Sequence, residues 1–277
     1  MKKISLLTIV LCLTAFFSSC NKDKGTTNLH IKIFPFQVID EPLAKASASE
    51  AVTKLQVYLF DANDNAVDSV IQNASDANFG TIDFTAIPSG SYTIVALGHI
   101  GSTLAVVSSP TVAQFPNGII PDAFCATRNI TIGATADLDL NMVLDRMVAE
   151  FRLCATTPMP AEVASIEINY SASGTHFNPT TALATSNTGY SFSINTNGYA
   201  GQLVNPHCTV LLNSDPQTMD VVVNAKNSAG TVLFTHTFTN VQFQRNHRIT
   251  ASGPLFGSNG TGSITFNNTW IDDTANW

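Results

Sequence analysis

The sequence predicts an all-β protein built from two β-sandwiches in tandem. Apolar residues recur at every second position in many short segments, and residues with turn chemistry separate those segments. No segment shows sustained helical periodicity. The 277 residues exceed one ordinary domain, and two sandwiches of ~110–140 residues each are the natural division.

The first twenty residues have the layout of a secretory signal. Lys2 and Lys3 precede an apolar run over 4–17, and Ser18-Ser19-Cys20 follows it. Small residues directly before a cysteine resemble a bacterial lipobox, which predicts a signal peptide over 1–19 and lipidation of Cys20. The alternative is ordinary cleavage with Cys20 incidental. The run is too short for a membrane span, so we expect a body tethered to a membrane by acyl chains and a polar tether over 20–28.

Four segments of the first half alternate apolar and polar residues, which is typical of strands with one buried face. They are Leu29–Ile33, Leu55–Leu59, Tyr92–Leu97 and Asp137–Leu144. Turn residues separate them at 61–65, 88–90 and 117–118. The acidic stretch at 61–65 lacks the glycine and distal glutamate of an EF-hand loop, so we interpret it as a turn. Residues 101–126 form a long apolar connection whose pattern leaves two readings open, a wrap around a sandwich or a short helix.

The second half repeats the alternation, with turn signals at 197–198, 228–230 and 259–260. We place the join at Asp145-Arg146, which gives residues 29–145 and 146–277, each large enough for a seven-stranded antiparallel sandwich. The alternating segments are Met147–Leu153, Ile166–Tyr170, Tyr190–Ile194, Met219–Val223, Val232–Phe238 and Ile264–Trp270.

Charge and composition favour an extracellular β protein and argue against nucleic acid as a partner. Charged residues are 12% of the chain, about half the usual share. Without residues 1–19, which hold two lysines and no acid, 11 basic and 20 acidic residues leave a net side-chain charge of −9. Phosphate binding needs a basic face instead.

No motif predicts an enzyme, a metal site or a cofactor. The six histidines form neither HxH nor HExxH, and the adjacent pair His207-Cys208 points to opposite faces of a strand. No nucleophile elbow or phosphate-binding glycine loop occurs. Cys125, Cys154 and Cys208 are an odd number, which excludes a fully paired framework within one chain. They are expected to be buried thiols, with one bridge between two of them as the alternative.

Several segments together resemble one family, the fimbrillins and fimbrial anchor lipoproteins of Bacteroidales, which are type V pilus subunits. Besides the lipobox at Cys20, they are Leu55–Asp61, Ile87–Ala96, Leu144–Phe151 and Arg245–Ile249. The resemblance implies two transthyretin-like Greek-key sandwiches and delivery to the outer membrane as a lipoprotein. It also implies partners that are other fimbrial subunits, and a host or bacterial surface ligand reached through the assembled pilus.

In that family an arginine-specific protease removes the first strand of stalk and tip subunits, and a strand from the next subunit fills the groove by β-strand addition. Here no arginine lies between Cys20 and Arg128. The loop expected to be processed, about 39–51, carries Lys45 as its one basic residue. We therefore favour an anchor and length regulator that keeps its first strand, with cleavage at Lys45 and a polymerising or tip subunit as the alternative.

The C-terminal stretch 262–277 suits a strand that a partner shares. Ile264, Phe266 and Trp270 lie on one face of an extended strand, and Trp277 follows. The equal alternative is the last strand of the second sandwich with its aromatic residues in the core. A rival function from another class is a glycan-binding surface lipoprotein, for which the aromatic candidates are Tyr199, Trp270 and Trp277.

Overall fold

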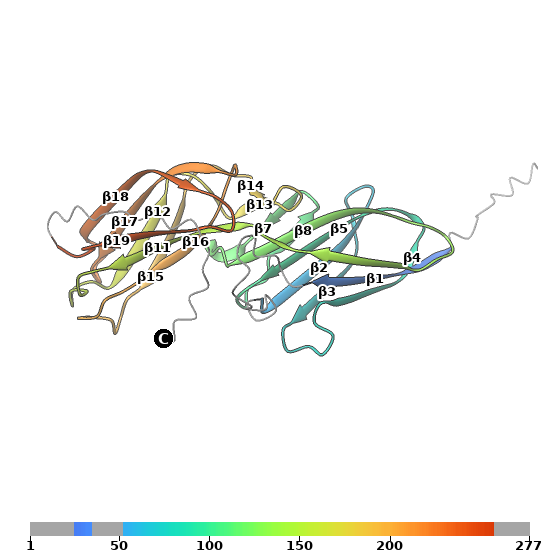
Figure 1. The fold of residues 1–277 in the computed structure, drawn as a ribbon, viewed down its shortest axis with the longest axis horizontal. Coiled ribbons are helices and arrows are strands. Elements are labelled where there is room, and N and C mark those ends of the chain that lie inside the picture. Colours follow the sequence, from blue (N-terminus) through green and yellow to red (C-terminus); the bar gives the residue numbers. More distant parts are fainter. Residues whose placement is uncertain (1–24, 35–51, 258–277) are drawn as a thin grey trace, which may run out of the picture.

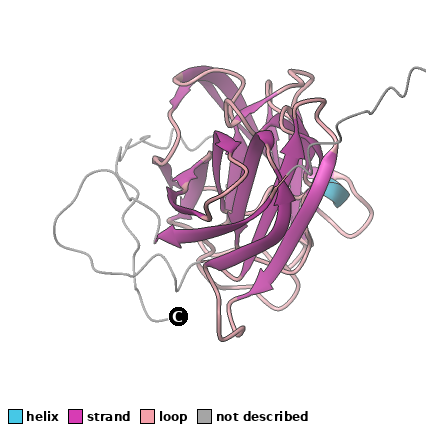
Figure 2. Cartoon of the chain, turned by 90° about the vertical axis from the view of Figure 1, so that its right-hand side faces the viewer, coloured by secondary structure: helices cyan, strands magenta, loops and turns pink. Residues whose placement is uncertain are grey.

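The computed structural model describes residues 25–34 and 52–257. Within them the chain forms nineteen strands and one 3-10 turn (Pro116–Gly118). Two β-sandwiches lie end to end along the long axis (Figure 1), and Figure 2 shows that strands and loops make up almost all of the described chain. The all-β prediction is confirmed. Among these residues no helix is long and apolar enough to cross a membrane. The predicted signal peptide, Cys20, Lys45 and the stretch 262–277 lie outside the described residues.

The first half contains a sheet of three strands in the order β4-β1-β9 and a sheet of five in the order β10-β8-β5-β2-β3. The strands of the first sheet are β1 (Thr26–Phe34), β4 (Thr81–Pro88) and β9 (Leu138–Val143). Those of the second are β2 (Lys54–Asp61), β3 (Ala66–Asn73), β5 (Gly90–His99), β8 (Ala123–Ile132) and β10 (Asp145–Arg146).

The second half packs a sheet in the order β16-β11-β19 against one in the order β15-β12-β17-β18. Its first sheet holds β11 (Val148–Ala155), β16 (His207–Leu211) and β19 (Arg248–Gly253). Its second holds β12 (Ser165–Tyr170), β15 (Tyr190–Asn195), β17 (Gln217–Lys226) and β18 (Val232–Phe243).

Both halves follow the same topology. β1, β2, β3, β4, β5, β8 and β9 occupy the sheet positions that β11, β12, β15, β16, β17, β18 and β19 occupy in the second half. Most neighbouring strands pair antiparallel, as expected. The exceptions are two parallel pairs that occupy the same place in the two halves, β1 with β9 and β11 with β19. The chain crosses between sheets before each last strand, and such a crossover permits parallel pairing that a tight hairpin does not.

The predicted tether ends earlier than expected. β1 begins at Thr26, whose neighbour Thr27 is 3% exposed and donates its hydroxyl to the Gly133 carbonyl at 2.9 Å. Sequence reasoning also missed β4, although Ile82 and Phe84 alternate with polar residues there and are both buried. Sequence reasoning missed β3 as well. Its alternation is less clear, because the apolar residues Val67 and Ile71 lie on its exposed face.

The unassigned stretch 101–126 connects the two halves. It forms the hairpin β6 (Val106–Ser109) and β7 (Val112–Gln114), which continues into a second hairpin, β13 (His176–Asn178) and β14 (Leu183–Ala184), as one four-stranded sheet. The rings of Phe115 and Phe177 stack across this sheet with centroids 4.9 Å apart. It therefore joins an insertion of the first half to an insertion of the second.

One hydrophobic core runs through this junction. A single cluster of buried residues includes Phe60 and Val95 from the first half and Phe151 and Phe243 from the second. For this reason β2 is buried on both faces: Val57 faces the core of the first half, while Gln56 faces the junction and is fully buried. The Gln56 amide is satisfied by both backbone groups of Ala105, at 2.9 and 3.0 Å.

Arg146 makes the principal polar contacts at the junction. Its side chain is 3% exposed and forms a bidentate pair with Asp122, at 2.8 and 3.1 Å. A further guanidinium N–H donates to the Asn246 side chain at 2.8 Å, and the guanidinium lies over the Phe124 ring, 4.7 Å from its centroid. A charge buried in this way is stable only because its hydrogen bonds are met.

We expect Arg146→Met to destabilise the protein by about 3 kcal/mol, because the half-buried Asp122 would lose its bidentate guanidinium partner and Asn246 would lose a hydrogen bond. Chemical denaturation followed by circular dichroism measures this. Arg128→Met, at an exposed position on β8, is the matched control and should change stability by less than about 0.5 kcal/mol. Equal effects of the two substitutions would contradict the role given to Arg146.

A second prediction concerns pH and His99, which is fully buried next to Gln56. Burial lowers the pKa of His99, so as the pH falls this histidine is protonated in the unfolded chain before it is protonated in the folded protein. Stability should therefore decline as the pH falls below about 6.5, the ordinary histidine pKa. Unfolding midpoints at pH about 7.5 and about 5.5 test this, and His99→Gln should show a smaller decline. An unchanged decline in that variant would assign the effect to other groups.

Candidate functional site

Strand β1 lies in the middle of its sheet. On one side it pairs antiparallel with β4, where Leu29 is opposite Phe84 and Ile31 opposite Ile82. On the other it pairs in parallel with β9, where Leu29 is opposite Leu138 and Ile33 opposite Met142. Removal of β1 would leave a slot of strand width between β4 and β9, with backbone hydrogen-bonding groups along both sides.

Alternate side chains of β1 fill the core beneath that slot. Leu29 is 0% and Ile31 1% exposed, and both belong to the core cluster of the first half. On the outer face the Nδ1 of His30 lies 2.6 Å from the Asp83 carboxylate, whose hydrogen bond raises the pKa of His30. The buried face therefore supplies apolar contact, and the outer face is polar.

The start of β1 is tightly held. Gly25 lies so close to residue 134 that a Cβ there would be 2.1 Å from the Ala134 carbonyl oxygen, so only glycine fits. The backbone N–H of Asn28 donates to Asp137 at 2.9 Å, and the Gly25 carbonyl accepts from the Ser89 N–H at 3.2 Å. The chain thus enters β1 along a defined path.

A second feature is a groove of about 540 Å³ on one side of the second half. It lies where β15 and β16, the edge strands of the two sheets, face each other. Tyr199, the glycan-platform candidate from the sequence, is 51% exposed in this groove, and Leu203 is 59% exposed. Trp270 and Trp277, the other two aromatic candidates, lie outside the described residues.

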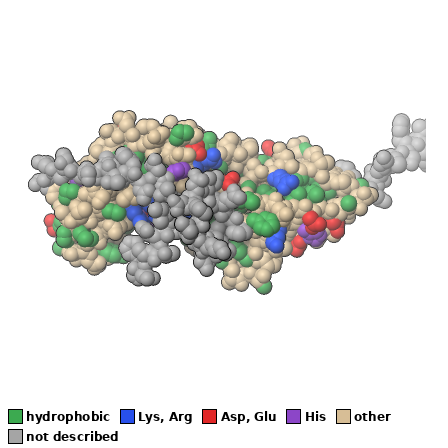
Figure 3. Space-filling model, in the orientation of Figure 1, with side chains coloured by type: hydrophobic (Ala, Val, Ile, Leu, Met, Phe, Trp, Pro, Cys, Tyr) green, Lys and Arg blue, Asp and Glu red, His purple; other side chains and the backbone are tan. Residues whose placement is uncertain are grey.

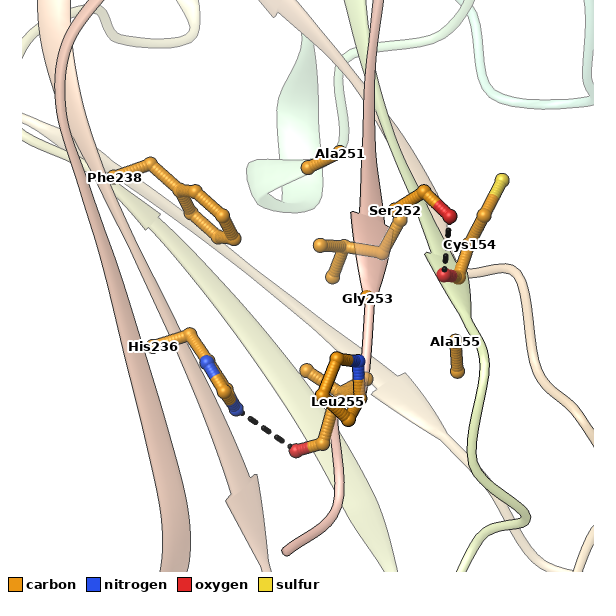
Figure 4. A pocket seen from close by; sticks show the side chains of 10 residues that line it. Cys154, Ala155, His236, Phe238, Ala251, Ser252, Gly253 and Leu255 are labelled. Atoms are coloured by element: carbon orange, nitrogen blue, oxygen red, sulfur yellow. Dashed lines mark hydrogen bonds between the residues drawn. The ribbon is translucent and has the colours of Figure 1, made fainter. Parts of the chain in front are cut away.

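The opposite side of the second half, between β18 and β19, is closed. There the His236 side chain of β18 contacts the Leu255 carbonyl, Nε2 to oxygen at 2.9 Å, just beyond the end of β19 (Figure 4). Phe234 and Phe256 add an edge-to-face ring contact with centroids 6.0 Å apart. The remaining hollow has a volume of about 40 Å³, which leaves no room for a strand.

Reactive chemistry is not assembled in the part of the chain that the structure describes. No group of three or more histidine, cysteine or acidic side chains there could hold a metal ion. Cys125, Cys154 and Cys208 are free, the first and last of them buried. Burial raises the pKa of both buried thiols to about 12, so they stay protonated and unreactive at neutral pH.

The predicted turn at 61–65 is present, and the Asp61 side chain stabilises it. The Asp61 carboxylate accepts the backbone N–H groups of Asn63 and Asn65 at 2.8 and 2.9 Å, which lowers the pKa of Asp61. Where Figure 3 shows described residues, they are mainly neutral side chains and backbone, with few lysine, arginine and acidic side chains.

Comparison with solved structures finds the same fold in proteins of Bacteroides and Porphyromonas. A candidate adhesin from Bacteroides ovatus matches with a TM-score of 0.58 at 10% identity, over 92% of this chain and 99% of that one. The fimbrial anchor protein Mfa2 from Porphyromonas gingivalis matches with 0.53 at 12% identity, over 87% and 99%. A Bacteroides thetaiotaomicron protein described as a candidate polysaccharide-binding protein matches with 0.53 at 14%, over 87% and 98%.

Because the sequence identities are so low, these structural similarities establish the fold alone. A search of the curated proteins found no match. A family model matches residues 107–277, which is more than half of the chain. The protein therefore belongs to DUF6562, a family of unknown function.

Proposed function

We propose that this protein is a structural subunit of a surface fimbrium that engages its neighbours by β-strand addition. The observation that carries the proposal is the central position of β1, whose alternate side chains fill the core of the first half. A strand held in this way has the arrangement that β-strand addition produces, in which backbone hydrogen bonds give affinity and apolar pockets set the register. The shared fold with a fimbrial anchor protein supports the proposal.

Within that function we propose the role of anchor and length regulator. No arginine lies between Cys20 and Arg128, and Lys45 is the one basic residue of the loop that follows β1. β1 is also held by two ladders and by the full burial of Leu29. A chain that keeps this strand has no vacant slot in its first half. It would start or end a filament, whereas a polymerising or tip subunit would need cleavage at Lys45.

The remaining features follow the same proposal. Lipidation at Cys20 would hold the body on the outer membrane, exposed at the cell surface, and the partners would be other fimbrial subunits. We propose structural units at 29–145 and 146–277. The sheets support this division, because β1 to β5 and β8 to β10 pair with one another in the first half. A strand within 262–277, with Ile264, Phe266, Trp270 and Trp277, would join the first filament subunit.

The second candidate function is glycan binding at the β15/β16 groove. It rests on the exposed Tyr199, on the neutral amides of Gln202 and Asn195 beside it, and on the fold shared with a candidate polysaccharide-binding protein. Binding of neutral oligosaccharides to residues 21–277, lost on Tyr199→Ala, would favour this function over the fimbrial one.

We expect Ile31→Ala to lower the free energy of unfolding by about 2–5 kcal/mol, since it leaves a cavity where β1 packs into the first core. Denaturant unfolding of the purified body measures the loss. Lys32→Ala, exposed on the same strand, should cost less than about 0.5 kcal/mol. Similar small losses for both would show that β1 is not an integral part of the sandwich.

Deletion of the gene in its native cell, with filaments imaged on cells and in the medium, tests the role. An anchor predicts long filaments shed into the medium, because nothing holds their base or limits their length. Loss of all filaments would indicate a stalk role instead, and unchanged filaments would contradict the fimbrial function.

Complementation sharpens this experiment. The full gene should restore attached filaments, while a gene ending after Thr261 should yield a folded, surface-located protein that leaves filaments in the medium. Full restoration by the shortened gene would rule out 262–277 as the partner strand.

A further inference from the structure

The two halves share a topology, but they close the corresponding side in different ways. In the first half this side lies between β3 and β4, and the side chain of Gln72 bridges it. Gln72 is 3% exposed; it accepts the Gly80 N–H at 2.9 Å and donates to the Thr81 carbonyl at 2.9 Å. The edge of β3 is thereby tied to the start of β4.

In the second half an apolar residue replaces that bridge. Ile194 occupies the position that corresponds to Gln72. Gln72 pairs with Leu55, the second residue of β2, and Ile194 pairs with Ile166, the second residue of β12. Ile194 and its neighbour Phe192 point into the sandwich yet are only half-buried. The core is consequently open between β15 and β16, and among the described strands none pairs with the outer side of either.

The opening is long enough for a strand. The groove of about 540 Å³ has Ile166, Phe192, Ile194 and Val204 on its walls, and neutral polar residues such as Asn195 and Gln202 at its rim. It meets a second hollow, of about 440 Å³, at Phe192 and His207, and this hollow reaches Ile120 at the junction of the halves. The first groove has no acidic, lysine or arginine side chain in its lining.

The described chain ends two strand spacings away from this groove, across the sheet β16-β11-β19. The Phe256 N–H donates to the Thr157 hydroxyl at 3.2 Å, and two residues later the Met159 N–H donates to the Gln202 carbonyl at 2.8 Å. Ala155, which pairs with Gly253, also donates to the Val204 carbonyl at 3.1 Å. Two strand spacings, about 10 Å, therefore separate Gly253 from the groove wall.

The segment after this point has the right length and chemistry to fill the groove. Residues 258–271 contain no charged side chain, and Ile264, Phe266 and Trp270 fall on one face of an extended strand. Six residues, 258–263, span up to about 20 Å, which is enough to turn into the groove. The six residues of β15 then match a strand of about 20 Å.

We propose that residues 264–270 of this chain dock in its own β15/β16 groove. The segment would run from the far end of the second half towards the junction, antiparallel to β15, and add a strand to that edge. Ile264, Phe266 and Trp270 would cover Phe192 and Ile194, closing the core that the first half closes with Gln72. This docking describes the chain without a bound partner. In a fimbrial subunit the same strand would have to leave the groove before it could join another subunit, so the docking does not depend on the fimbrial function.

Fluorescence of Trp270 tests the docking, because the chain has two tryptophans, Trp270 and Trp277. In a Trp277→Phe protein, Trp270 should emit at short wavelength and resist acrylamide quenching, equally at all protein concentrations. Adding Ile194→Glu, which places a charge on the groove wall, should shift the emission to longer wavelength and raise the quenching constant several-fold.

Two further variants separate docking from loss of fold. Leu203→Glu changes a side chain that is 59% exposed at the groove mouth, and it should also expose Trp270 while the circular dichroism spectrum stays the same. Val232→Glu, at a position 45% exposed on β18, is the matched control and should leave Trp270 protected.

Four results would overturn the proposal. If Trp270 is fully quenchable before any groove substitution, the segment does not dock in the groove. If Trp270 is protected equally in all three glutamate variants, the segment lies elsewhere. Protection that appears only as concentration rises, together with dimers, would assign the groove to a second copy of the chain. Oligosaccharide binding lost in Leu203→Glu, with Trp270 exposed throughout, would assign it to a glycan.

Discussion

The buried guanidinium of Arg146 is the contact on which the relation between the two halves depends. It joins the end of the first half to Asp122, before β8, and to Asn246, before β19. Because a buried charge is costly without partners, the segment that carries Arg146 and the two segments that supply its partners are held in one arrangement. The core cluster that includes Phe60 and Phe151 surrounds this contact with apolar packing. The halves are therefore joined by a packed interface in addition to the covalent chain.

The repeated topology gives each half the same strand positions and a different use for them. In the first half the central strand β1 fills its own slot, and Gln72 seals the side between β3 and β4. In the second half β11 occupies the position of β1 and is continuous with β10, so it cannot be displaced without breaking the junction. The open side lies between β15 and β16 instead. One fold thus has a central strand paired on both sides in one half and an open groove in the other.

The segments that carry the resemblance to fimbrial subunits prove to be structural. Leu55–Asp61 forms β2, buried on both faces. In Ile87–Ala96, the Tyr92 hydroxyl donates to the Pro88 carbonyl at 2.8 Å and holds the turn into β5. Leu144–Phe151 and Arg245–Ile249 meet at the junction, where Arg146 contacts Asn246 and Arg248 pairs with Glu150. Such motifs identify a fold, and the function must be argued from the grooves.

The sequence by itself determined the all-β class and most of the long strands, because burial of one face imposes a period of two that is visible locally in Leu29–Ile33 or Tyr190–Ile194. It also indicated the turn at Asp61, whose carboxylate bonds to its own loop. Only the tertiary structure decided the parallel pairing of β1 with β9, the hairpin within 101–126, the double burial of β2 and the open side at Ile194. These features depend on which distant segment lies alongside, and the alternation of residues within one strand carries no information about its neighbour.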